Sequence, residues 1–210
     1  MDNITEVIKR RYNRTAMFYD WMDFMISDSV RKDALSMAKG KVLEVGVGTG
    51  KNLSLYPSRC KITGIDFSKE MLKRARDKAK KLNLSVELLE MDAQKMDFDD
   101  NTFDTVVSTC VFCSVPDPVK GLEEVKRVCK PNGQIILLEH VRSANPAIGK
   151  VMDFLNPITL KMVGSNINRE TVGNVNKAGI SLKEVADVGK TKILKLIIAE
   201  PEGFKEQKCH

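Results

Sequence analysis

Short apolar runs alternate along the chain with segments whose apolar residues recur at helical spacing. The runs are rich in β-branched residues, as expected of strands buried on both faces of a sheet. The predicted strands lie at residues 41–45, 62–66, 103–109 and 134–139, with one more that closes at residues 90–93. This alternation of strands with helical segments predicts a doubly wound α/β fold.

The helical segments carry one buried stripe each. In residues 69–82 the many lysines and arginines fall outside the apolar stripe, which is typical of a solvated helix face. The stripe is expected at Met71, Leu72, Ala75, Ala79 and Leu82. Asp117 is a good capping residue and Pro118 suits a first helical turn, so a second long helix is expected to begin there. A shorter helical pattern follows Gly50, and the Pro-Asn-Gly sequence at residues 131–133 predicts a turn before the fifth strand.

The carboxyl-terminal part of the chain predicts a helix followed by a hairpin. The helix is expected at residues 169–177, and two strands, 181–188 and 192–200, are joined tightly at Gly189. A tight connection joins antiparallel strands, so one of these strands should run against the rest of the sheet. Residues 201–210 are expected to form a polar tail.

A glycine-rich turn is the strongest functional signal. Three glycines at alternate positions follow the first strand and its acid, in the order Glu44, Gly46, Gly48 and Gly50. Bare backbone at the carboxyl end of a first strand lets a nucleotide-like ligand approach closely. The dinucleotide fingerprint requires glycine where this chain has Lys51, and the P-loop requires serine or threonine where it has Asn52. The spacing therefore excludes both of those motifs.

Two acids stand at the ends of the next strands. Asp66 lies 20 positions after Gly46, where a carboxylate can accept hydrogen bonds from ribose hydroxyls. Asp92 is suitably placed for the amino group of an adenine. The alternatives are an ordinary turn-forming acid at Asp66 and a helix or turn cap at Asp92.

Together these motifs resemble those of the class I S-adenosylmethionine-dependent methyltransferases. The resemblance covers about residues 41–140 and rests on Glu44-x-Gly46-x-Gly48-x-Gly50, Asp66, Asp92-Ala93 and the strand at 103–107. It implies S-adenosylmethionine as cofactor, S-adenosylhomocysteine as product, and a seven-stranded, mostly parallel sheet whose last strand is antiparallel. It also implies that the glycine backbone lies near the methionyl and ribose groups, that Glu44 orients the loop, and that Asp66 binds the ribose. The remaining expected cofactor contacts are Phe67 or Met71 against adenine, Asp92 at its amino group, and Ala93, Tyr12 and Thr109.

Methyl transfer from a sulfonium requires positioning, exclusion of water and, for some acceptors, removal of a proton. His140 directly follows the fifth strand and is a candidate base, although it could equally orient substrate or cap a turn. Tyr19 is a second catalytic candidate, and Tyr19, His140 and Arg169 are candidate substrate contacts, with a surface ion pair as the alternative for Arg169. Cys110 and Cys113 are interpreted as packing residues, and no metal site is expected.

Residues 1–40 are expected to form an N-terminal helical lid or substrate segment, and residues 41–200 the S-adenosylmethionine-binding domain. Aromatic residues and methionines are concentrated between Tyr12 and Phe24, after a basic stretch that begins at Lys9. Such a segment could cover the active site and touch an anionic membrane surface, or it could simply pack on the sheet edge.

Composition and charge restrict the partners and the cellular location that are expected. The formal net charge of +6 invites a nucleic-acid partner, but no aromatic platform accompanies the basic residues, which disfavours that partner. The apolar runs are too short to span a bilayer and the amino terminus lacks a signal-like core. The five cysteines suit a reducing compartment, so a cytoplasmic protein is expected, with peripheral attachment at the inner membrane face as an option. The oligomeric state is left open.

A closer resemblance extends over nearly the whole chain. It rests on four stretches, at residues 12–20, 111–117, 138–142 and 166–170. They resemble the quinone C-methyltransferases, the phosphatidylethanolamine N-methyltransferases and the alkyl-thiol methyltransferases, which implies a lipophilic small molecule or a lipid headgroup as methyl acceptor. A phosphatidylethanolamine-type amine is the leading expectation, and thiol and quinone acceptors stay open. The alternative from another class is a regulatory module that binds S-adenosylmethionine without catalysis.

Overall fold

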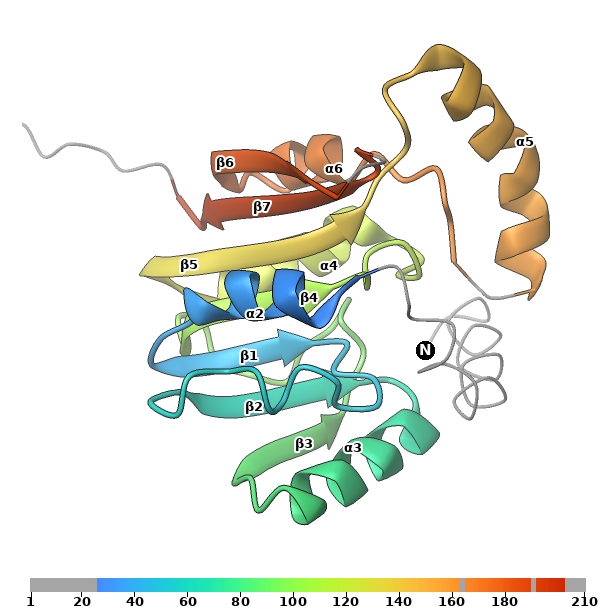
Figure 1. The fold of residues 1–210 in the computed structure, drawn as a ribbon. Helices are drawn as coiled ribbons and strands as arrows, with labels where there is room; N and C mark the ends of the chain where they lie inside the picture. Colours follow the sequence, from blue (N-terminus) through green and yellow to red (C-terminus); the bar gives the residue numbers. More distant parts are fainter. Residues whose placement is uncertain (1–25, 163–164, 190–191, 203–210) are drawn as a thin grey trace, which may run out of the picture.

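The computed structural model describes residues 26–162, 165–189 and 192–202. Seven strands form one sheet in the order β3-β2-β1-β4-β5-β7-β6 (Figure 1). The strands are β1 (Lys41–Val45), β2 (Lys61–Asp66), β3 (Val86–Glu90), β4 (Phe103–Thr109), β5 (Cys129–His140), β6 (Ser181–Val188) and β7 (Leu194–Glu200). Only β7 is antiparallel to its neighbours β5 and β6. The predicted sheet with its reversed last strand is confirmed.

Helices cover both faces of the sheet, so the doubly wound arrangement is also confirmed. They are α2 (Asp28–Ser36), α3 (Lys69–Lys81), α4 (Pro118–Val128), α5 (Pro146–Met162) and α6 (Thr171–Lys177). In Figure 1, α2 and α3 lie in front of the sheet and α4 and α6 behind it. The fifth helix, α5, stands beyond the edge toward which β1 to β5 point.

Each face of the sheet has its own apolar core. Behind the sheet, Leu122 and Val125 of α4 pack with Leu43 and Val106 of the central strands. In front, Ala34 and Leu35 of α2 pack with Val42, Val107 and Ile136. The described part of the expected N-terminal lid, α2, thus packs on the sheet, whereas residues 1–25 lie outside the described residues.

The long helices follow the sequence pattern closely. Ser68 caps α3 by accepting a hydrogen bond from the Met71 N–H, and Asp117 caps α4 in the same way through the Lys120 N–H. Leu82, expected in the buried stripe of α3, is instead the C-cap residue and is 45% exposed. The stripe fails there because the helix has already ended.

Two local predictions are wrong. The segment after Gly50 forms successive turns, with Leu53 N–H bonded to Gly50 O at 3.3 Å, and no α-helix. Pro57 follows too soon for a longer helix, because the residue before a proline avoids the helical region. Residues 131–133 do not form a turn between α4 and the strand, because β5 already begins at Cys129 and includes them. The pairing of β5 with β4 shifts register across these residues.

Candidate functional site

A cleft opens at the carboxyl ends of β1, β2 and β4. The strand order reverses between β1 and β4, and ligands of open α/β sheets bind at such a switch point. The lining combines polar residues, among them Glu44, Asn52 and Asp66, with apolar residues such as Met91 and Val111. Among the described residues, no three or more His, Cys, Asp or Glu side chains group as metal ligands would.

The three predicted loop glycines have different roles. All adopt positive φ, and Gly46 and Gly48 line the cleft. A Cβ on Gly46 would lie 2.4 Å from Val111 Cγ2, whereas a Cβ on Gly48 would meet nothing closer than 4.0 Å. Gly50 does not line the cleft; a Cβ there would lie 3.1 Å from the Ala75 Cα of α3. Gly48 therefore leaves open backbone at the cleft, while Gly46 and Gly50 allow close packing behind it.

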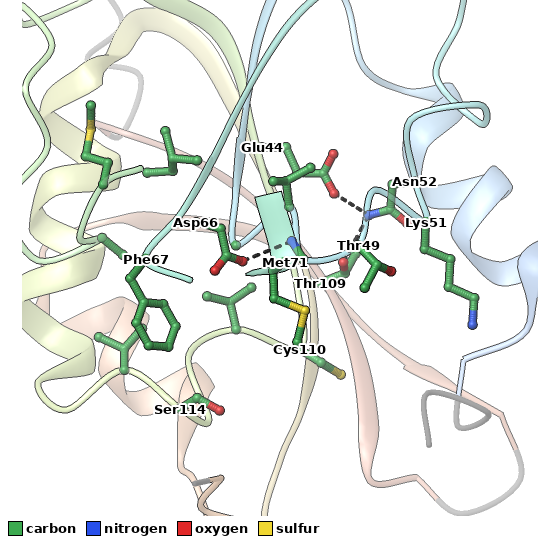
Figure 2. A pocket seen from close by; sticks show the side chains of 18 of the residues that line it. Glu44, Thr49, Lys51, Asn52, Asp66, Phe67, Met71, Thr109, Cys110 and Ser114 are labelled. Carbon is green, nitrogen blue, oxygen red and sulfur yellow. Dashed lines mark hydrogen bonds between the residues drawn. The ribbon is translucent and has the colours of Figure 1, made fainter. Parts of the chain in front are cut away.

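Asp66 holds the glycine loop and the start of α3 together. Its Oδ2 accepts from the Gly48 N–H at 3.0 Å (Figure 2). Its Oδ1 accepts from the Ser68 N–H at 2.8 Å. Burial raises the pKa of Asp66 to about 6, against the opposing effect of these two hydrogen bonds. Each carboxylate oxygen keeps a second lone pair, so the side chain can still accept from a ligand hydroxyl.

Asn52 joins the polar groups on the other side of the cleft. Its amide nitrogen donates to Glu44 Oε1 at 2.7 Å and to Thr109 Oγ1 at 3.0 Å (Figure 2). Its oxygen accepts from Arg31 at 3.0 Å. Burial raises the pKa of Glu44 to about 7, although Asn52, Tyr56 and Arg31 favour its charged form. The second oxygen of Glu44 has no hydrogen-bond partner within the described residues. This arrangement fixes the strand end that leads into the glycine loop.

The remaining predicted cofactor residues surround the same cleft. Phe67, Met71, Asp92, Ala93 and Thr109 all line it. Asp92 Oδ1 accepts from the backbone N–H of Gln94 at 2.9 Å, which is the turn-forming role offered as its alternative. Asp92 nevertheless faces the cleft, so a turn role and a ligand role are compatible.

The wall between β4 and α4 depends on a residue that the sequence did not single out. Glu139, which is fully buried, accepts through Oε1 from Ser108 Oγ at 2.6 Å, Val111 N–H at 3.0 Å and Phe112 N–H at 3.5 Å. Next to them, Cys110 lines the cleft with a φ of 53°, a left-handed conformation that is costly for a non-glycine residue. Glu139 therefore braces a strained wall.

The predicted substrate residues are not gathered in this cleft. His140 ends β5 on the sheet face that carries α2, does not line the cleft, and has its pKa lowered by burial. Arg169 donates to the carbonyl of Val115, a cleft residue, at 2.8 Å, and burial lowers its pKa. Tyr12 and Tyr19 lie outside the described residues. The catalytic and substrate roles of all four stay predictions.

Sequence reasoning also missed Arg31 and Asn52. Arg31 is 3% exposed on α2, which had been assigned to the lid segment, and it reaches the cleft from there. Asn52 was considered only as a mismatch to the P-loop. A buried amide so close to a glycine turn is a usable signal, because a buried polar side chain must find partners.

Comparison with known proteins identifies the group of enzymes. A family model described as a methyltransferase domain matches residues 43–137. The chain is 43% identical over 140 residues to a phosphatidylethanolamine N-methyltransferase of Cereibacter sphaeroides, a match that spans 64% of this chain and 68% of that protein. The chain belongs to the class I S-adenosylmethionine-dependent methyltransferases. It is an enzyme of this class, and its cofactor is S-adenosylmethionine.

Other relatives of this methyltransferase act on different acceptor atoms, judging by their names. The thiol S-methyltransferase TMT1B of Rattus norvegicus is 32% identical over 67% of this chain and 59% of that protein. The ubiquinone/menaquinone biosynthesis C-methyltransferase UbiE of Bdellovibrio bacteriovorus is 29% identical over 76% and 72%. A solved structure of a Bacillus halodurans methyltransferase has a TM-score of 0.70 at 19% identity, covering 85% of this chain and all of that one, and supports the fold.

Proposed function

We propose that this methyltransferase transfers a methyl group to the amine of a phosphatidylethanolamine-type lipid headgroup. The supporting observation is the 43% identity to the phosphatidylethanolamine N-methyltransferase over most of both chains. A thiol or a quinone ring carbon is the second candidate, because the thiol S-methyltransferase and UbiE relatives match a similar share of this chain at lower identity.

The cleft residues fit the cofactor chemically. Asp66 would accept from the ribose hydroxyls, and the open backbone at Gly48 would lie against the methionyl and ribose groups. Asp92 would meet the adenine amino group, with Phe67 and Ala93 as apolar contacts for its ring. When bound, S-adenosylmethionine supplies a methyl group already activated on a sulfonium.

The acceptor amine must lose its proton before it can attack. Burial lowers the pKa of His140, so its imidazole is mostly neutral at pH 7 and can accept a proton. We assign the base role to His140 because it ends β5 at the sheet edge where the cleft opens and its imidazole can accept a proton, and Tyr19 stays a second catalytic candidate. Arg169 has a buried Nε without a partner in the described residues, which would suit a headgroup phosphate.

A labelled-methyl assay tests the acceptor. The purified enzyme is incubated with methyl-labelled S-adenosylmethionine and, in parallel, with phosphatidylethanolamine vesicles, an alkyl thiol and a demethylated quinol. Label in the methylated phospholipid, well above the thiol and quinol reactions, is the expected result. Label confined to the thiol or the quinol would overturn the amine assignment, and cofactor binding without transfer to any of the three would refute all three acceptors.

The His140→Ala variant tests the base. Loss of a general base typically slows turnover by about 10²–10⁴-fold. We expect a loss in this range for the amine at pH 7, largely recovered at high pH, with unchanged S-adenosylmethionine binding by calorimetry. Unaltered turnover would remove His140 from the mechanism.

A further inference from the structure

Helix α5 exposes an apolar face that the rest of the described chain does not cover. Phe154 is 78% exposed, Val151 56%, Ile158 52% and Ile148 50%, and Leu155 is 40% exposed. At 100° per residue these positions fall on one side of the helix. Exposed large apolar residues elsewhere in the described chain are scattered singly, as is normal for a protein surface.

The opposite side of α5 is attached to the protein. Met152 is buried there, and its sulfur accepts from the Ser143 N–H at 3.3 Å. Asn156 donates to Asn166 Oδ1 at 3.1 Å. Asn166 in turn donates twice, from its backbone and from its side chain, to the Cys113 carbonyl in the cleft wall, at 2.8 and 3.2 Å. The helix is therefore held in a defined orientation next to the cofactor cleft.

The charges on α5 are also arranged by side. Its one acid, Asp153, is paired with Arg142 at 2.8 Å and accepts from Asn168 at 3.0 Å, so its charge is neutralised from within the protein. Its two lysines, Lys150 and Lys161, are exposed, and on a helical projection both lie along one edge of the apolar face, next to Phe154. An apolar face bordered by lysines is the pattern of a helix that lies in the interfacial layer of an anionic membrane.

We propose that the face formed by Ile148, Val151, Phe154, Leu155 and Ile158 inserts into the headgroup layer of an anionic lipid surface. The inference rests on the proposed function, since it places the cleft where a lipid headgroup is available. Helix α5 lies beyond the edge at which β1 to β5 end, and the cofactor cleft opens at that same edge (Figure 1). A docked α5 holds the cleft mouth close to the lipid, and Lys150 and Lys161 meet lipid phosphates.

A second copy of the chain is a poorer occupant of this face. The exposed area of the five side chains is on the order of 500 Å², below the roughly 800 Å² per partner that a stable protein interface usually buries. The flanking lysines would also face each other's charge in a symmetric contact of two such helices. An anionic lipid surface offers apolar contact to the exposed face and negative charge to the lysines.

Vesicle flotation of the full-length enzyme tests the inference. The probes are phosphatidylcholine vesicles with and without phosphatidylglycerol, and the variants are Val151→Asp and Phe154→Asp. Val185→Asp is the matched control, because Val185 is 40% exposed on β6 and lies outside the proposed face. We expect the wild type to prefer phosphatidylglycerol vesicles and each α5 variant to lose about tenfold or more in vesicle partitioning, with the control unchanged.

Two further measurements keep the outcomes distinct. Calorimetric S-adenosylmethionine binding should be the same in all variants, which shows that the cleft is folded. Methylation of a short-chain phosphatidylethanolamine dispersed below its micelle concentration should also be retained, while methylation of vesicle lipid falls. Wild-type binding to neither vesicle, or equal vesicle binding by Phe154→Asp, would overturn the inference, as would a wild-type dimer that Phe154→Asp dissociates without any vesicle binding. If the α5 variants lose vesicle binding but the wild-type enzyme methylates only thiols or quinols, the proposed lipid-binding face stands and only the amine acceptor is refuted.

Discussion

The Glu139→Gln variant should make the protein's stability less dependent on pH. Burial raises the pKa of Glu139 from 4.5 to about 7, more than the hydrogen bonds from Ser108, Val111 and Phe112 lower it. Glutamine keeps an oxygen for those three donors but cannot ionise. The variant therefore removes the titration while preserving the brace on the cleft wall.

The sign and size follow from proton linkage. Between pH 5 and pH 7 the folded protein retains a proton on Glu139 that the unfolded chain has mostly released, so the free energy of unfolding falls as pH rises. One pKa unit corresponds to about 1.36 kcal/mol, and the span from pH 5 to a folded pKa near 7 gives a loss of about 2 to 3 kcal/mol by pH 8. This contribution is present in the wild type and absent from Glu139→Gln.

Urea unfolding at pH 5 and pH 8 provides the measurement. Other titrating groups are common to both proteins, so the difference between the two pH dependences isolates Glu139. We expect the wild type to lose about 2 to 3 kcal/mol more than the variant between the two pH values. Identical pH dependences would refute the reasoning, because they would mean that the buried carboxyl ionises as easily as an exposed one.

Three other perturbations address the cofactor cleft. Gly46→Ala places a methyl group 2.4 Å from Val111 Cγ2 and forces alanine into positive φ, so calorimetry should show at least about tenfold weaker S-adenosylmethionine binding. Gly173→Ala is the neutral control, because this helical position has no neighbour closer than 4.0 Å. In the wild type, that binding should strengthen between pH 5 and pH 7.5 as Asp66 ionises through its pKa of about 6, and Asp66→Asn should bind more weakly without this pH dependence. Asn52→Ala removes the amide donor from buried Glu44, and urea unfolding should show a loss of about 1–3 kcal/mol; unchanged stability would show that the carboxyl finds another donor.

The fold was predictable because buried strands leave a continuous apolar pattern. The sequence also placed Gly48 just after β1 and Asp66 at the end of β2. Because the carboxyl ends of parallel strands lie at one edge of a sheet, the two residues were expected close together, and Asp66 accepts from the Gly48 N–H. Local prediction failed where spacing alone was used. Leu53 and its neighbours have helical spacing, but Pro57 limits the segment to turns.

The groups that hold the cleft in shape were less predictable, since each acts through a contact distant in sequence. Arg31 reaches Asn52 across 21 positions, and Glu139 braces Val111 across 28. Helix α5, Pro146–Met162, was not predicted from the sequence at all. An apolar helical stripe normally predicts burial, and nothing in the local pattern reveals that Phe154 faces outward.

The three carboxyl groups with raised pKa values all lie at one edge of the sheet, so the free-energy cost of burying their charges is concentrated there. Glu44, Asp66 and Glu139 are all buried there, and each disfavours folding in its charged form at neutral pH. Asp66 and Glu139 accept hydrogen bonds from the Gly48 and Val111 N–H groups, so the backbone that lines the cleft is ordered before any ligand binds. A cleft ordered in advance loses little conformational entropy on binding, which leaves cofactor affinity dependent on these carboxyls. Stability at neutral pH should therefore rise in Glu139→Gln, whereas Asp66→Asn should lose cofactor affinity, and the two variants separate the two effects.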